Sequence, residues 1–216
     1  MVAHKNIDSA LRVSEFLLQI KAVQLSPEKP FTWASGILSP IYCDNRRILS
    51  FPKIRTHIRQ EMVACVQENY GRPDLIAGVA TGGIAIGVMV AQELGLPFVY
   101  VRPKPKEHGM GNQIEGVIES GQSVIVIEDL ISSGKSSLQA VAALRAQDCM
   151  VKGMISIMTY GLPEADENFK KEKCHLVSLT NYDLLTQQAL ESGYISADQM
   201  DVLTEWRTDP KNWKKG

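Results

Sequence analysis

Near its middle the chain reads Val124-Ile125-Val126-Ile127-Glu128-Asp129-Leu130-Ile131-Ser132-Ser133-Gly134-Lys135-Ser136. Four β-branched residues open this segment, which is typical of a strand that is buried on both faces. The strand ends on two adjacent carboxylates and leads into a loop of small hydroxyl residues and glycine. An amphipathic helix follows, with Leu138, Val141 and Leu144 on its apolar side. The segment therefore predicts a strand–loop–helix unit with charged groups at the end of the strand.

The acidic pair and the loop together suit a phosphorylated sugar. The carboxylates of Glu128 and Asp129 can accept hydrogen bonds from sugar hydroxyls. The backbone N–H groups of residues 132–136 point out of the N-terminus of the predicted helix, where they can hold a phosphate dianion.

Two other interpretations of this segment compete with the first. Its ending, Gly134-Lys135-Ser136, is also the end of an NTP-binding P-loop, but that motif needs a glycine five positions before Gly134. Asp129 stands there and would repel a phosphate. The simpler alternative is an ordinary turn with a serine N-cap. The two carboxylates count against it, because charges at the end of a buried strand are costly without a partner.

Composition narrows the class of protein. Hydrophobic and charged contents of 44% and 22% are ordinary for a globular protein, and a net charge of −1 gives no reason to expect nucleic-acid binding. The four cysteines are scattered and include no Cys-x-x-Cys pair, so we expect reduced thiols inside the cell. Residues 75–91 carry no charge, but four glycines interrupt them, and a packed strand and helix explain them better than a membrane span. A soluble, cytoplasmic protein is expected.

Strands and helices alternate along most of the chain. The sequence predicts helices at residues 7–20, 52–69, 84–94 and 136–146, and strands at residues 31–33, 37–43, 75–79, 98–102, 124–127 and 154–158. Such alternation indicates an α/β fold with a central, mostly parallel sheet flanked by helices. The length fits a single domain over residues 1–216. The polar tail, residues 206–216, is expected to be frayed or to rest on the surface.

Ligands of parallel sheets bind at the carboxyl ends of the strands. This rule places Thr81-Gly82-Gly83, Arg102 and Glu128-Asp129 along one edge of the predicted sheet. The loop at Thr81–Gly83 also opens a helix, and its glycines allow an anion to approach the backbone closely. A tight turn is the alternative for this loop taken alone. Beside the acidic pair, it suggests a site for a second anionic group of the same ligand.

The polar connection between Pro103 and Gly116 carries positive charge. Arg102, Lys104, Lys106 and His108 lie on or beside it, and two prolines and two glycines set its stiffness. The ordinary interpretation is a solvated basic loop. Because this loop leaves a strand end next to both candidate anion sites, it can also be a lid that excludes water and neutralises a leaving group.

These motifs resemble those of the phosphoribosyltransferases, whose phosphoribosyl-pyrophosphate motif is similar to residues 128–136. The resemblance extends to the orotate phosphoribosyltransferases. Phe31-Thr32-Trp33-Ala34-Ser35-Gly36 followed by Ser39-Pro40 is similar to their N-terminal hood, roughly residues 1–50 here. Their mobile catalytic loop is matched by Arg102, Lys106, Glu107, His108 and Gly109.

The resemblance implies a type I phosphoribosyltransferase fold and a role for each motif. Glu128 and Asp129 hold the ribose hydroxyls, residues 132–136 cradle the 5-phosphate, and Thr81, Gly82 and Gly83 face the pyrophosphate. Orotate is held by Ser132 and by the hood around Ser35, Gly36 and Tyr42. Asp129, Arg102, Lys106 and His108 are implied to be catalytic. The last three serve the pyrophosphate in the partner subunit of a homodimer, and magnesium is held mainly by the substrate, with no direct protein ligand.

The implied activity is the transfer of ribose 5-phosphate to orotate in pyrimidine synthesis. In one branch of the family, lysines stand where this chain has Gly82, Pro103 and Ala34, and an arginine that helps to hold the base carboxylate falls at Tyr160 or a neighbour. Two alternatives remain for the function. One is a phosphoribosyltransferase for another base, such as a purine, and the other is a non-catalytic regulator that senses the sugar pyrophosphate.

Overall fold

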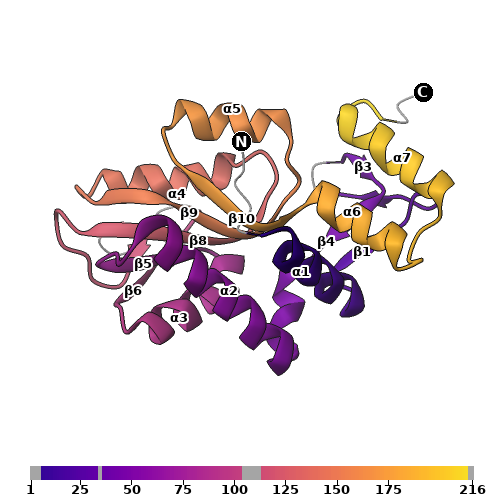
Figure 1. The fold of residues 1–216 in the computed structure, drawn as a ribbon. Helices are drawn as coiled ribbons and strands as arrows, with labels where there is room; N and C mark the ends of the chain where they lie inside the picture. Colours follow the sequence, from indigo (N-terminus) through magenta and orange to yellow (C-terminus); the bar gives the residue numbers. More distant parts are fainter. Residues whose placement is uncertain (1–5, 34–35, 104–112, 214–216) are drawn as a thin grey trace.

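The computed structural model describes residues 6–33, 36–103 and 113–213. Its centre is a six-stranded sheet with the order β10-β9-β8-β5-β6-β7 (Figure 1). The strands are β5 (Leu75–Val79), β6 (Phe98–Val101), β7 (Ile114–Glu115), β8 (Ser123–Ile131), β9 (Met150–Thr159) and β10 (Leu176–Asn181). All neighbouring pairs are parallel except β6 and β7. The predicted α/β fold with a mostly parallel sheet is therefore confirmed.

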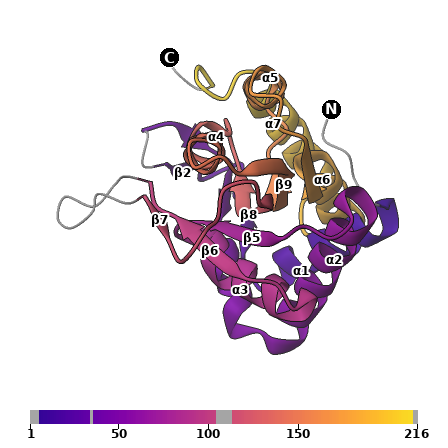
Figure 2. The ribbon, with the colours of Figure 1, turned by 90° about the vertical axis from the view of Figure 1, so that its left-hand side faces the viewer.

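Helices cover both faces of the sheet. One face carries α1 (Ile7–Gln19), α2 (Pro52–Tyr70) and α3 (Gly82–Leu94), and the other carries α4 (Lys135–Arg145) and α5 (Pro163–Lys171) (Figures 1 and 2). The alternation of side chains along β8 builds a core on each side. Ile125 and Ile127 belong to the cluster beneath α1–α3, whereas Val124 and Val126 belong to the cluster beneath α4 and α5.

The N-terminal part of the chain adds two small antiparallel sheets and a 3-10 helix. One sheet pairs β1 (Val23–Leu25) with β4 (Ile41–Cys43), and the other pairs β2 (Phe31–Thr32) with β3 (Leu38–Ser39). The 3-10 helix η1 (Asn45–Ser50) follows β4. These strands lie within the hood predicted over roughly residues 1–50, and we restrict that name to the described residues 23–33 and 36–43. At the end of the chain, α6 (Tyr182–Glu191) and α7 (Ala197–Thr208) lie beside the hood (Figure 1).

Aromatic contacts join the hood to these C-terminal helices. The Trp33 ring lies 5.6 Å from Trp206 and 5.3 Å from Tyr160, centroid to centroid. Trp206 is fully buried and Trp213 is 5% exposed. The prediction of a frayed or surface tail is wrong for these two residues, because their indole rings are buried among side chains from distant parts of the chain.

Several predicted boundaries also differ from the structure, among them the start of β9, which lies at Met150 and not at Met154. The single strand expected over residues 37–43 is divided at Pro40, because β3 pairs with β2 while β4 pairs with β1. The helix expected from Ile84 begins at Gly82. β8 continues to Ile131, because its ladder with β9 extends to the pair Ile131–Thr159. Glu128 and Asp129 thus lie within the strand rather than beyond it.

Residues 75–91, which carry no charge, form β5 and most of α3. Among the residues that the structure describes, no helix combines the length and the apolar character needed to cross a membrane.

Candidate active site

Three neighbouring strands of the sheet end at the candidate site. β5 leads into Thr81–Gly83, β6 leads into Arg102, and β8 carries Glu128 and Asp129 near its carboxyl end. The strand order β8-β5-β6 and the parallel pairing bring these three ends to one edge. The juxtaposition that the sequence predicted is confirmed.

Two helices open at this edge without a side-chain cap. The N-cap of α3 is Thr81, whose side chain accepts no hydrogen bond from the first turn, and that of α4 is Gly134, which has no side chain. In contrast, α1, α6 and α7 are capped by Asn6, Asn181 and Ser196. Uncapped backbone N–H groups and the positive end of the helix dipole favour an anion. Both predicted anion sites therefore have the backbone that such a site needs.

Glu128 is held inside the site by two internal hydrogen bonds. Its Oε2 accepts from the Ser137 hydroxyl at 2.8 Å, and its Oε1 accepts from the Asp129 backbone N–H at 2.9 Å. The residue is only 6% exposed. Burial, and then the neighbouring charge of Asp129, raises the pKa of Glu128 well above its ordinary value. Ionisation of Glu128 therefore lowers the stability of the folded protein when no ligand is bound.

We expect Glu128→Gln to stabilise the free protein at neutral pH. A raised carboxyl pKa means that the folded state binds the proton more tightly, so wild-type stability falls as pH rises above the unfolded-state value of 4.5. Glutamine carries no charge and keeps both hydrogen bonds, because the Ser137 hydroxyl can accept as well as donate. Thermal unfolding without ligand should show a gain in stability near neutral pH that shrinks toward acid pH.

Glu164→Gln is the matched contrast. Hydrogen bonds from Lys135 and then Lys211 lower the pKa of Glu164. Its ionised form therefore stabilises the fold above the unfolded-state pKa, and this contribution is lost as pH falls. This variant should lose stability at neutral pH and match wild type in acid. Equal losses of stability for Glu128→Gln and Glu164→Gln at every pH would contradict the assignment of Glu128.

Asp129 lies against the N-terminus of α3. A Cβ atom added to Gly82 would overlap the Asp129 carboxylate, and one added to Gly83 would overlap the carbonyl oxygen of Ile127. The peptide bond between Ala80 and Thr81 is cis. From the other side, Asn45 Nδ2 donates to the Asp129 carbonyl oxygen at 2.7 Å. The glycines therefore allow the acidic strand end and the helix start to approach one another directly.

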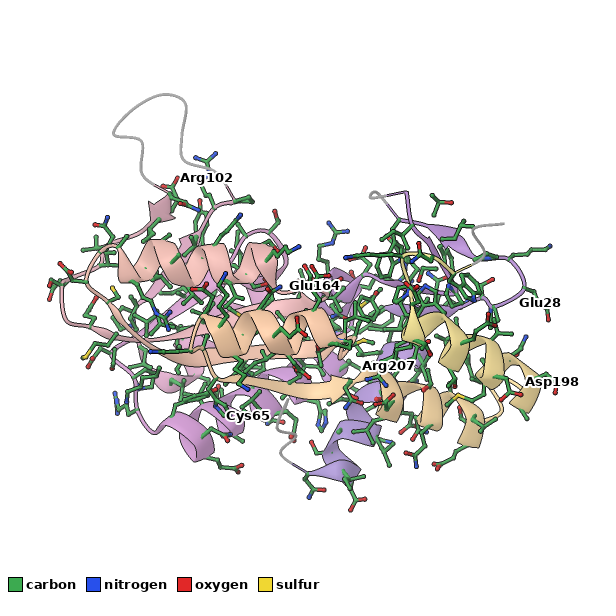
Figure 3. The ribbon with its side chains drawn as sticks, turned by 90° about the horizontal axis from the view of Figure 1, so that it is seen from above. Glu28, Cys65, Arg102, Glu164, Asp198 and Arg207 are labelled. Atoms are coloured by element: carbon green, nitrogen blue, oxygen red, sulfur yellow. The ribbon has the colours of Figure 1, made fainter. Side chains whose placement is uncertain are left out.

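Arg102, labelled in Figure 3, directly follows β6 at this edge. Its backbone N–H donates to the Gln113 carbonyl at 2.9 Å, and its guanidinium lies 3.6 Å from the Glu115 carboxylate. The Arg102 side chain is 35% exposed, so this ion pair is weak and can exchange for a ligand anion. The predicted lid residues Lys106 and His108 lie outside the described residues.

The hood faces the loop after β8 across a cavity of about 380 Å³. Trp33 and Ile37 line it from the hood, and Ser132 lines it from the loop. Gly36 turns the chain between the two hood residues with a φ of +81°, a conformation that favours glycine. Tyr42 is not among the lining residues; it packs on Phe31 at 5.6 Å, and Ser35 lies outside the described residues.

The structure also adds residues that the sequence did not point to. Arg207 and Lys211, from the end of the chain, line the same cavity. Asn45 and Ser137 fix the acidic pair, and Asn168 donates to the Ser133 carbonyl oxygen at 2.9 Å. Ser137 could have been found, since it directly follows the predicted phosphate loop. The others are distant in sequence from the groups they contact and carry no local signal.

An acidic pair with one buried and one half-buried carboxylate lies at this sheet edge, together with two open helix N-termini and a hooded cavity. These features define a class of sugar-phosphate transferase. The sequence pattern of the phosphoribosyl transferase domain matches residues 44–179, so the chain belongs to the phosphoribosyltransferase family. Within it, the chain belongs with the orotate phosphoribosyltransferases. Those of Phocaeicola vulgatus and Bacillus subtilis are 53% and 52% identical to it, over 94% of this chain and 96% and 95% of theirs.

Solved structures agree with this assignment. Orotate phosphoribosyltransferase from Aeropyrum pernix superposes with a TM-score of 0.73 at 27% identity, covering 85% of this chain and 99% of that one. Leishmania donovani UMP synthase superposes with a TM-score of 0.77 at 24% identity, covering 92% of this chain and 42% of that one. At 24% identity, the similarity to UMP synthase shows the fold alone.

Proposed function

We propose that this protein transfers the ribose 5-phosphate group from 5-phospho-α-D-ribose 1-diphosphate to orotate. The products are orotidine 5′-monophosphate and pyrophosphate, in the de novo synthesis of UMP. Relatives about half identical over nearly the whole chain support the activity. The observation that carries the proposal for the site is the sheet edge where two uncapped helices flank Glu128 and Asp129.

The reaction requires positioning and charge stabilisation more than covalent chemistry. A ring nitrogen of orotate forms a bond to the anomeric carbon of the sugar, while the bond from that carbon to the diphosphate oxygen breaks and its electron pair leaves with pyrophosphate. Asp129 accepts hydrogen bonds from the ribose hydroxyls and faces the positive charge that develops on the sugar ring. Thr81–Gly83 and Arg102 face the negative charge that grows on the leaving group.

The loop after β8 anchors the other end of the sugar. The first backbone N–H groups of α4, with the hydroxyls of Ser132, Ser133 and Ser136, hold the 5-phosphate. Ser132 also lines the hooded cavity, so the phosphate and the base are bound on either side of one short loop. Orotate is then enclosed by the hood, where Trp33 and Ile37 line the cavity and Gly36 turns the chain between them, whereas the predicted neighbour Tyr42 does not line it.

Magnesium is the proposed cofactor. Glu128 and Asp129 are the carboxylates of the described edge that could hold it, and Glu128 is already engaged by Ser137 and the Asp129 amide. This donor set fits an ion that takes most of its ligands from phosphate oxygens and water and few from the protein. When bound with the sugar diphosphate, magnesium neutralises charge on the leaving pyrophosphate.

A homodimer in the cytoplasm is the proposed working form. The lid residues Lys106 and His108, with Arg102, then serve the site of the partner subunit. Free cysteines at all four positions are consistent with a reducing compartment.

An assay with separate bases tests the proposed activity. The protein, the sugar diphosphate and magnesium are incubated with orotate, adenine, hypoxanthine or uracil. We expect loss of orotate absorbance and no nucleotide from the other bases. Turnover of a purine instead would favour the other-base alternative, and binding of the sugar diphosphate without turnover of any base would favour the regulator.

A further inference from the structure

Helix α5 contacts three consecutive residues of the loop after β8. Asn168 Nδ2 donates to the Ser133 carbonyl oxygen, the Phe169 ring packs on Gly134, and Glu164 pairs with Lys135 at 2.6 Å. α5 begins with Pro163, carries acidic residues in its first turn and lysines in its last, and is thus a helix that its own sequence stabilises. The loop after β8 therefore packs against a stable helix.

The Asn168 contact determines which way a loop amide points. In a trans peptide, the carbonyl oxygen and the following N–H point in opposite directions. Because Asn168 holds the Ser133 carbonyl, the Gly134 N–H points away from α5. Within the described residues this N–H has no acceptor. It is one of the groups that the proposed function assigns to the 5-phosphate.

The packing of the Phe169 ring on Gly134 restricts the backbone conformation of the turn. Gly134 has a φ of +75° and is buried, and a Cβ atom there would meet the Phe169 ring at 2.5 Å. The Glu164 carboxylate also lies 3.1 Å from the Lys211 Nζ, so it links Lys135, the first residue of α4, to Lys211 near the end of the chain. Three different kinds of contact therefore fix three successive loop residues against one helix.

We infer that α5 is a positioning element for the 5-phosphate loop, and that Asn168 is the residue that orients the Ser133–Gly134 peptide toward the phosphate. This inference rests on the proposed function, which places the 5-phosphate at that loop. Asn168 does not touch the substrate. It acts through the peptide that it holds, so its replacement should change the affinity for the phosphate more than the affinity for the base.

Asn168→Asp tests this role with almost no change of shape. A carboxylate oxygen replaces the donating amide and faces the Ser133 carbonyl oxygen, which repels it. We expect the Kd for ribose 5-phosphate, measured by calorimetry, and the KM for the sugar diphosphate to rise about tenfold. The KM for orotate should rise less than the KM for the sugar diphosphate, since Asn168 does not line the hooded cavity and reaches it only through Ser133.

Asn69→Asp is the matched control. Asn69 Nδ2 also donates to a backbone carbonyl, that of Cys65, at 2.9 Å, but on α2, which does not border the site. It should leave both binding constants unchanged. If Asn168→Asp does not fold, Asn168→Ala removes the donor without adding a charge, and the Kd is then expected to rise about fivefold.

The two possible failures can be told apart. Wild-type affinity for ribose 5-phosphate in the Asn168 variants, or an equal effect of Asn69→Asp, would overturn the role of α5. If the wild-type protein bound ribose 5-phosphate only weakly and turned over no base, the proposed function itself would fail.

Discussion

Gly82→Ala is expected to lower turnover about 10²-fold while the protein stays folded, because a displacement of reacting groups by about 1 Å can have an effect of that size. The added Cβ atom would occupy the place of the Asp129 carboxylate. That carboxylate is the far end of a flexible side chain, so it can rotate away at little expense to stability. It would then leave the position from which it faces the ribose. Steady-state kinetics and thermal unfolding of the same preparation measure the two effects.

Gly87→Ala, on the same helix, should lower stability and leave turnover nearly unchanged. A Cβ atom at Gly87 would meet the Phe98 ring at 2.7 Å, inside the core and not at the acidic pair. Overpacking of this kind should lower stability by about 1–3 kcal/mol and change turnover little. If Gly82→Ala retained wild-type turnover, Asp129 would not need its observed position, and its assignment as a catalytic residue would be wrong.

The Gly82 contact also gives a physical reason for one departure from the family. Some members carry a lysine where this chain has Gly82. Here the side-chain position is already taken by the Asp129 carboxylate, so a lysine could enter only if that carboxylate left its place facing the ribose. A cation for the leaving group must come from elsewhere, and Arg102, with its weak partner Glu115, is the described residue able to supply it.

The sequence was sufficient for the architecture and for the outline of the site, because both depend on local patterns. Buried runs such as residues 124–127 and the rule for strand ends brought Thr81, Arg102 and Asp129 to one edge. The length of β8 could not be predicted in this way. The adjacent carboxylates suggested an end to the strand, but pairing with β9 continues the strand for four residues beyond Ile127.

Contacts between remote segments were the main omission. Asn168 is 35 residues from Ser133, and Trp33 meets Trp206 across most of the chain. Neither Asn168 nor Trp206 forms a motif with its own neighbours. An asparagine in a polar helix and a tryptophan near the end of the chain have ordinary local explanations, so only the packing of the folded chain shows that they support the site.

Lys106→Ala is expected to lower kcat by about 10²-fold or more, as the loss of a single charge-stabilising group does in other active sites. Lys106 would stabilise the charge on pyrophosphate as it leaves, so the effect should fall on turnover more than on the affinity for orotate. Asp129→Asn should be similarly inactive, because it removes the charge that faces the sugar. The conservative control is Lys106→Arg, which keeps the positive charge and should retain more activity than Lys106→Ala.

A mixture of the two inactive variants distinguishes a lid that serves its own subunit from one that serves the partner. If Lys106 acts in the partner's site, a dimer with one Lys106→Ala chain and one Asp129→Asn chain contains one site with both native groups and one site with neither. Random exchange between equal amounts should then restore about a quarter of wild-type activity. A lid that serves its own subunit would leave every site of the mixture with one defect, and activity would stay at the average of the two variants. Because a monomer would give that same result, the mass of the wild-type protein in solution must be measured alongside. A dimer without recovery would contradict the shared lid and leave the Asp129 assignment intact.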